Sequence, residues 1–192
     1  MKICFNILYH HTQLIIARKT EQYYSKWGQV LLRESDFLKE PEHICRNTML
    51  ENSPSCDYVF ILDLDEIITN DDMEKIIDGL EKKPRRDMVM AREIVDYASP
   101  TSAYTGRGHT PIIAVSPGVR FYDARCAHGS SSYVMDVKIH HISYIVGRAW
   151  KKDRYKEYNK NELRIYEEQE KGGIIPIEVT KELREIMSVY GG

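Results

Sequence analysis

Several features that would assign this chain to a broad class are missing from it. No apolar run approaches the roughly 18–20 residues of a membrane-spanning helix, so we expect no membrane span. The formal net charge is only −2, which leaves no basic field for nucleic acid or for an anionic membrane surface. A single lysine precedes a short apolar run that ends at His10 and His11, a pattern unlike that of a secretory signal peptide. These absences favour an ordinary globular protein.

The four cysteines show no recognisable spacing. Cys4, Cys45, Cys56 and Cys126 are scattered, and no two of them form a C-x-x-C motif. The pattern therefore indicates neither a zinc module nor a disulfide framework. It predicts free thiols, mostly buried, and a reduced, cytoplasmic setting.

The most distinctive segment is a run of five apolar residues, 58–62, followed by Asp63, Asp65 and Glu66. An apolar run of this length predicts a strand that is buried on both faces of a sheet. Ligands gather beyond the carboxyl ends of such strands, and clustered carboxylates there need a compensating cation. We therefore predict that Asp63 and Asp65 bind Mg²⁺ or Mn²⁺ that carries a phosphate.

Hydrophobic periodicity and breaker residues predict an alternating order of strands and helices, hence an α/β fold with parallel strands. A chain of 192 residues with 42% hydrophobic composition suits one domain. Residues 98–118 are rich in Pro, Gly, Ser and Thr and predict loops near a rim. The expected strands cover residues 2–9, 29–32, 58–62, 87–95 and 133–146, and the expected helices cover 13–27, 42–51, 70–83, 149–170 and 179–190.

The last predicted strand carries two neighbouring histidines on opposite faces. Met135, Val137 and Ile139 alternate with polar residues, and side chains of a strand point to opposite faces in turn. His141 therefore falls on the apolar, inward face, and His140 falls on the more polar one.

Several short motifs follow one another along the chain: Asp36-Phe37, Arg46-Asn47, Asp63-Leu64-Asp65-Glu66, Val119-Arg120-Phe121, and His140-His141-Ile142-Ser143-Tyr144 followed by Lys151, Lys152 and Lys156. Taken in this order, they resemble the motifs of GT-A glycosyltransferases, most closely the bacterial family 2-like enzymes. The resemblance covers about residues 30–160, and it implies an α/β GT-A-like fold, that of the nucleotide-diphospho-sugar transferases, with a mostly parallel central sheet flanked by helices.

The same resemblance implies one GT-A-like domain over residues 1–192. Within it, residues 1–97 would form a nucleotide- and metal-binding half, 98–170 an acceptor half and 171–192 a helical tail. Only about 62 residues precede Asp63, and the family's Asp-Gly-Ser-type turn is missing, so the fold is shortened at its N-terminus. A homo- or hetero-oligomer could complete that half.

The function implied is transfer of a sugar from a nucleotide-sugar, with a UDP-sugar favoured, to the hydroxyl of an unknown acceptor. The cofactor would be Mn²⁺ or Mg²⁺, and an imidazole ligand favours manganese. An inverting reaction would also need a general base for the acceptor hydroxyl. The implied roles are metal binding for Asp63, Asp65 and His141, donor binding for Asp63, Arg46, Asn47, Arg120, Lys151 and Lys152, and catalysis for Asp96, with Glu66 and Glu93 as lesser candidates.

Other interpretations stay open at this point. A non-catalytic sugar- or nucleotide-binding module, or an assembly subunit with a degenerate GT-A fold, would explain the short N-terminal half. Residues 61–66 also resemble the nucleophile strand of HAD-type phosphatases. More simply, Asp63 and Asp65 could be a polar strand end, His141 a core histidine, and the charges of residues 148–160 a solvated helix face.

Overall fold

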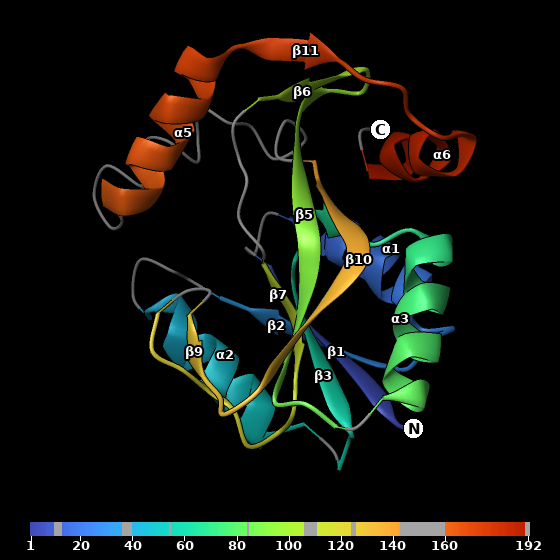
Figure 1. Ribbon diagram of the computed structural model, residues 1–192, viewed down its shortest axis with the longest axis vertical. Coiled ribbons are helices and arrows are strands. Elements are labelled where there is room, and N and C mark those ends of the chain that lie inside the picture. The colour runs from blue at the N-terminus through green and yellow to red at the C-terminus, as the bar shows by residue number, and fades with distance from the viewer. Residues whose placement is uncertain are drawn as a thin grey trace. The chain divides into compact units, whose positions relative to one another are not determined.

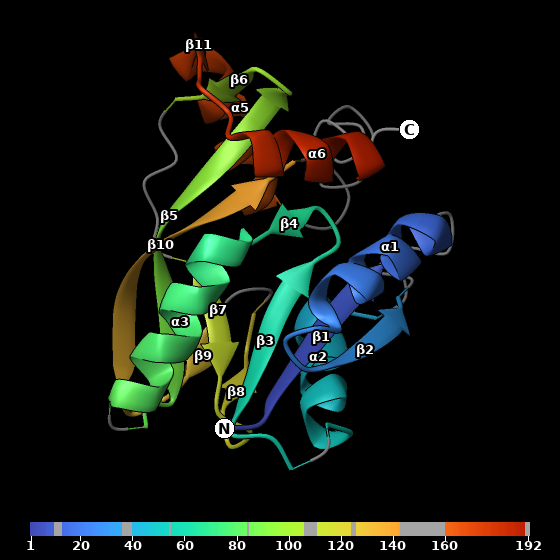
Figure 2. The same cartoon turned by 90° about the vertical axis from the view of Figure 1, so that its right-hand side faces the viewer.

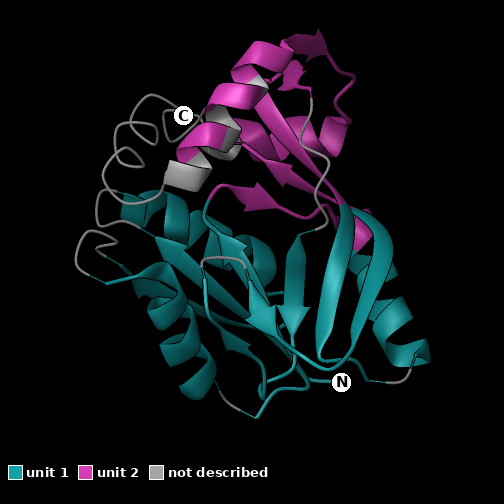
Figure 3. Cartoon of the chain, turned by 60° about the vertical axis from the view of Figure 1, so that its left-hand side comes forward, with its two compact units in different colours: residues 1–64, 73–92, 110–137 teal, residues 65–72, 93–109, 138–192 magenta. Residues whose placement is uncertain are grey.

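The computed structural model describes residues 1–9, 13–35, 40–53, 55–83, 85–105, 111–123, 126–142 and 160–190 (Figure 1). The chain divides into two compact units that interleave along the sequence (Figure 3). Unit 1 comprises residues 1–64, 73–92 and 110–137, and unit 2 comprises residues 65–72, 93–109 and 138–192. The predicted halves, 1–97 and 98–170, are by contrast consecutive in sequence. Among the described residues, no helix is both long and apolar enough to cross a bilayer.

Unit 1 is built on a mixed sheet whose core is parallel. Strands β1 (Ile3–Tyr9), β2 (Gln29–Glu34) and β3 (Tyr58–Asp63) are parallel, with β1 in the middle. Figure 2 shows β1 and β3 running side by side in the same direction. The apolar run after residue 57 is buried on both faces, as its composition predicts. The predicted α/β sheet with a parallel core is therefore present.

One predicted loop is a strand, which lies between β3 and β5 (Met88–Ser99). Residues 112–115 were predicted to lie in a loop, but they form β7 (Ile112–Val115), which is buried throughout and antiparallel to both neighbours. β5 (Met88–Ser99) therefore runs in the direction of β3 without pairing with it. A four-residue apolar run is too short for periodicity to distinguish a strand from other buried structure, which is why the sequence did not reveal it.

Three helices accompany this sheet. α1 (Leu14–Tyr24) packs against β1 and β2, and α2 (Glu42–Glu51) packs against β1 and β8 (Arg120–Phe121). α3 (Asn70–Lys82) follows the acidic segment with two aspartates in its first turn, where the helix dipole favours negative charge. Its cap is the preceding residue rather than Asn70, because the Thr69 hydroxyl accepts a hydrogen bond from the Asp72 amide at 3.3 Å.

α1 turns one side toward the sheet. Ala17, Thr20 and Tyr24 are buried, whereas Ile15 is 75% exposed. Gly28 lies where the chain turns from α1 into β2, and a β-carbon there would collide with the Ile3 carbonyl group. Glycine at this position therefore permits the close approach of the two strands, while α1 itself ends earlier, at Tyr24 with Ser25 as its C-cap.

A disulfide between Cys4 and Cys56 contradicts the prediction of four free thiols. Cys4 lies in β1, Cys56 comes just before β3, and their Cα atoms are 6.2 Å apart. Cys45 and Cys126 are the free cysteines of the described residues. Sequence spacing gave no sign of the bond, since the two sulfurs are 52 residues apart and meet only because β1 and β3 are neighbours.

Thiol counting tests this bond directly. Protein purified without reductant and denatured in the presence of a thiol reagent should release two thiol equivalents per chain, and reduction before denaturation should raise the count to four. The Cys4→Ser variant should show three thiols under both conditions, because Cys56 then loses its partner. Four thiols in the unreduced wild-type protein would show that Cys4 and Cys56 are free.

The described part of unit 2 contains short antiparallel strands and the helices α5 and α6. The end of β10 (Ser132–His141) pairs with β4 (Glu66–Ile67), while β6 (Ser102–Tyr104) pairs with the end of β5 and with β11 (Ile174–Pro176). α5 (Lys160–Gly172) and α6 (Lys181–Tyr190) follow. The predicted alternation along β10 is confirmed. The predicted helix over residues 149–170 is seen only from residue 160, because residues 143–159 lie outside the described residues.

Candidate functional site

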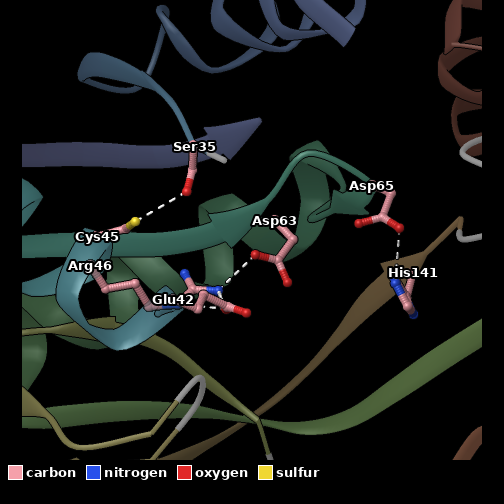
Figure 4. Close-up of polar contacts among 7 residues, drawn as sticks. All are labelled: Ser35, Glu42, Cys45, Arg46, Asp63, Asp65 and His141. Carbon is pink, nitrogen blue, oxygen red and sulfur yellow. Dashed lines mark hydrogen bonds and ion pairs between the residues drawn. The ribbon is translucent and has the colours of Figure 1, made fainter. Parts of the chain in front are cut away.

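The two aspartates of the Asp63-Leu64-Asp65 motif belong to different units, because the boundary between the units falls after Leu64. Each aspartate has a partner within its own unit (Figure 4): Asp63 lies beside Arg46, and Asp65 lies beside His141. The site is therefore described as two clusters.

The cluster in unit 1 is built around a buried arginine. The side chain of Arg46 is only 1% exposed, and its Nη2 atom donates to Asp63 Oδ1 at 2.7 Å. Its Nε atom donates to Glu42 Oε1 at 2.9 Å, one helical turn earlier on α2. A buried cation is costly unless it is paired, and these two carboxylates supply that pairing. Arg46 therefore holds Asp63, whose side chain remains 35% exposed, in a defined orientation at the end of β3.

A thiol lies beside this arginine on the same helix. Cys45 donates to Glu40 Oε2 at 3.0 Å. Its Sγ atom is 3.1 Å from the Ser35 hydroxyl oxygen, a contact that Figure 4 shows. Burial raises the pKa of the Cys45 thiol above its usual value, which keeps it protonated. A protonated, buried thiol is a poor nucleophile, so Cys45 is a packing residue of α2.

Asn47 holds the fold together rather than facing Asp63. Its amide nitrogen donates to the Phe121 carbonyl group at 2.8 Å, and its amide oxygen accepts from the Phe121 amide at 2.8 Å. The side-chain amide thus makes the pair of backbone hydrogen bonds that a neighbouring strand would make, and it links α2 to β8. The amide nitrogen and oxygen are both engaged with Phe121, and the donor-binding role of Asn47 stays a prediction.

The predicted phosphate-binding cations are not brought to Asp63 within the described residues. Arg120 Nη1 donates to the carbonyl groups of Pro117 and Val119, and its Nη2 atom lies 3.9 Å from Glu51, the last residue of α2. Glu51 is about two and a half helical turns from Glu42, the partner of Arg46. Lys151 and Lys152 lie outside the described residues.

The cluster in unit 2 places a histidine between two buried carboxylates. His141 Nε2 is 3.0 Å from Asp65 Oδ2, and His141 Nδ1 is 2.9 Å from Asp96 Oδ1. The pairing of β4 with the end of β10 holds these groups in place, as does a 2.8 Å hydrogen bond from the Ile142 amide to the Asp65 carbonyl group. The inward position predicted for His141 is confirmed, and Asp96 joins it because β5 extends past residue 95.

The neighbouring histidine has a different environment. His140 Nδ1 is 3.0 Å from the Tyr97 hydroxyl oxygen, and desolvation lowers the pKa of His140 to about 4. The imidazole of His140 is therefore neutral near pH 7. Asp96 and Tyr97, which are consecutive on β5, thus contact the two consecutive histidines of β10. The Asp96 carboxylate contacts His141, and the Tyr97 hydroxyl contacts His140.

Both predicted catalytic carboxylates, Asp96 and Glu66, are buried. The side chain of Asp96 is 0% exposed and Glu66 is buried within β4, so neither faces solvent. A general base must come within hydrogen-bonding distance of the acceptor hydroxyl. In this structure Asp96 contacts His141 and Glu66 is buried within β4, so the catalytic roles of both residues stay predictions.

Asp65 and His141 are the two residues of this cluster that could contribute ligands to a divalent cation. Among the described residues, no group of three or more His, Cys, Asp and Glu side chains is placed to hold a metal ion. Asp65 and Nε2 of His141 nevertheless face each other, whereas Asp96 contacts the opposite nitrogen of the ring. One or two protein ligands suffice where substrate phosphates and water complete the shell of Mg²⁺. The contact that has hydrogen-bond geometry is that of Nε2 with Asp65, whereas Nδ1 lies beside Asp96 as an ion pair.

Comparison with models of protein families and with curated proteins finds no match to this sequence. Among solved structures, the chain is similar to a glycosyltransferase involved in the glycosylation of the major capsid of PBCV-1, with 20% identity, 60% of each chain covered and a TM-score of 0.41. It is also similar to residues 1–349 of S. aureus TarS, with 9% identity, coverage of 85% of this chain and 68% of that one, and a TM-score of 0.46. The chain thus spans 60% of the length of the first of these structures. Because both likenesses are distant, function must be inferred from the site.

Proposed function

We propose that the chain is a metal-dependent glycosyltransferase that moves a sugar from a nucleotide-sugar to an acceptor hydroxyl. The observation that carries this proposal is the pairing of Asp65 with His141 Nε2, backed by Asp96 at Nδ1. It occurs at the motif that resembles the Asp-x-Asp of GT-A enzymes. A polar strand end or a core histidine alone would not require two buried carboxylates on one imidazole ring.

Asp65 and His141 would hold the cation, Mn²⁺ or Mg²⁺. When bound, such a cation neutralises the charge that develops on a diphosphate leaving group, a role worth several kcal/mol. Hard carboxylate oxygen suits both ions, and the imidazole nitrogen of His141 favours Mn²⁺.

Asp63 would bind the ribose or the metal, and Arg46 would position it. The arginine is buried behind Asp63, so it acts on a donor through that carboxylate rather than by direct contact. Asp63 is accessible enough to accept a hydrogen bond from a ribose hydroxyl. Glu42 thus contacts Arg46, Arg46 contacts Asp63, and Asp63 would lie nearest to the ligand.

A thermal-shift titration tests the proposal. UDP together with Mn²⁺ should raise the unfolding temperature more than either alone, because a ligand that binds only the native state stabilises it. Hydrolysis of a panel of nucleotide-sugars in the presence of Mn²⁺ should then identify the donor. Absence of any shift with UDP, GDP or other nucleotides, with or without metal, would contradict the transferase function. Turnover of a generic aryl phosphate instead would support the phosphatase alternative.

A further inference from the structure

A cavity of about 320 Å³ lies in unit 1, at the end of β3 that is opposite Asp63. Asp57 and Tyr58 line it where β3 begins, together with Leu80 and Glu81 from the last turn of α3. The 6 residues of β3, at about 3.3 Å each, put roughly 17 Å between its two ends. In Figure 2 the N-terminus lies beside the starts of β1 and β3, and both strands run away from it. The cavity is therefore separate from the Asp63 cluster.

Four charged side chains of both signs line this cavity: Asp57, Glu81, Lys83 and Arg85. Within the described part of the chain, none of the four forms an ion pair. The cations are held by neutral groups instead. Arg85 Nη2 donates to the Asp57 carbonyl group at 3.0 Å. Lys83 Nζ lies 4.2 Å from the centroid of the Tyr133 ring. Opposite charges that face one cavity without meeting are placed to bind a molecule between them.

The rest of the lining is apolar and already formed. Tyr58 and Leu80 are only 3% and 8% exposed, and Met1 completes the apolar surface. The Tyr58 hydroxyl accepts a hydrogen bond from the Arg86 amide at 3.0 Å, which fixes the ring. A volume of about 320 Å³ lies at the lower end of the range for small-molecule sites. At about 30 Å³ for one water molecule, it suits a ligand of roughly ten non-hydrogen atoms.

We propose that this cavity binds a small zwitterion with an apolar body, which is the chemistry of an apolar amino acid. Lys83 and Arg85 bind its carboxylate, since the Arg85 guanidinium keeps donors beyond the one used on the backbone. Glu81 binds its ammonium group, together with the oxygen of Asp57 that does not accept the Lys2 amide. The site is additional to that for sugar transfer and does not depend on the proposed function.

A ligand of a single sign fits this lining less well. An anion that meets Lys83 and Arg85 comes close to two carboxylates of its own sign, and a cation beside Glu81 comes close to two cations. A zwitterion meets each pair with the opposite charge. The apolar lining then contacts the body of the ligand, as in other small-molecule sites.

The test is a titration of ¹⁵N-labelled protein with L-phenylalanine at pH 7, followed in ¹H–¹⁵N correlation spectra. The amide resonances of the cavity residues should shift and saturate, while those around Asp63 should stay in place. Two probes with the same ring carry one charge each: 3-phenylpropionate lacks the ammonium group, and 2-phenylethylamine lacks the carboxylate. Each should bind about two- to fivefold more weakly than phenylalanine, the usual effect of losing one exposed ion pair.

Variants assign the two charges of the ligand to the two sides of the cavity. Lys83→Gln should weaken phenylalanine binding about two- to fivefold without weakening that of 2-phenylethylamine. Glu81→Gln should do the same to phenylalanine without weakening 3-phenylpropionate. The matched control is Lys82→Gln, because Lys82 precedes Lys83 but pairs with Asp78 and does not line the cavity. This control should bind all three probes like the wild-type protein.

The outcomes separate this inference from the proposed function. Equal affinity for the three probes would show recognition of the ring alone and would overturn the zwitterion site. Absence of saturable shifts at the cavity, or shifts around Asp63 instead, would overturn it as well. Each of these results leaves the transferase function standing, because that function is tested with UDP and Mn²⁺.

Discussion

Replacing Asp65 with asparagine is expected to lower Mn²⁺-dependent turnover of a nucleotide-sugar by at least about a hundredfold, while the fold is preserved. The substitution removes the negative charge that would hold the cation, and the cation's role is worth several kcal/mol, of which about 1.4 kcal/mol corresponds to tenfold in rate. The asparagine side chain has the same size and can still hydrogen-bond to His141, so the contact at the end of β10 can be retained.

Turnover should be measured as release of the nucleotide diphosphate, with Mn²⁺ and with chelator. The matched control is Asp78→Asn, because Asp78 is an exposed aspartate of α3 that pairs with Lys82. The control should keep wild-type turnover. If Asp65→Asn keeps metal-dependent turnover as well, the assignment of the Asp-x-Asp motif is wrong.

Local patterns in the sequence predicted the elements that carry the site. The apolar run before Asp63 predicted β3, and the alternation before His141 predicted β10 and the inward face of its histidine. Both patterns are local, because each is read from consecutive residues of one strand: a continuous apolar run in β3 and an alternation of every second residue in β10. The partners of these side chains could not be predicted in the same way. Asp96 meets His141 across 45 residues of sequence, so their contact depends on the pairing of β5 with β10.

Arg46 and Asn47 show a second limit of predicting the roles of residues from a sequence motif. The resemblance implies one donor-binding role for both, but consecutive residues of a helix point about 100° apart. Arg46 consequently faces the end of β3, and Asn47 faces β8. The side-chain directions on a helix therefore predict that Arg46 and Asn47 contact two different strands.

The last prediction concerns the stability of the arginine cluster. Arg46→Met should lower the free energy of unfolding by about 3 kcal/mol, the lower end of the cost of breaking a buried ion pair. Methionine fills much of the same volume, but it leaves Asp63 and Glu42 without the cation that pairs them. The lower end applies because Asp63 is partly exposed, so water can replace some of the lost interaction. Urea unfolding followed by circular dichroism measures the change.

Two further variants show whether the loss arises from burial and from the forked geometry of arginine. Arg18→Met removes an exposed arginine that pairs with Glu21 on α1, and it should leave the free energy of unfolding close to that of the wild-type protein. Arg46→Lys keeps the charge but cannot bond both carboxylates through a planar fork, so its stability should lie between those of wild type and Arg46→Met. A loss for Arg46→Met as small as that for Arg18→Met would mean that the buried ion pairs do not hold Asp63. In that case the orientation of Asp63 would have to come from β3 alone.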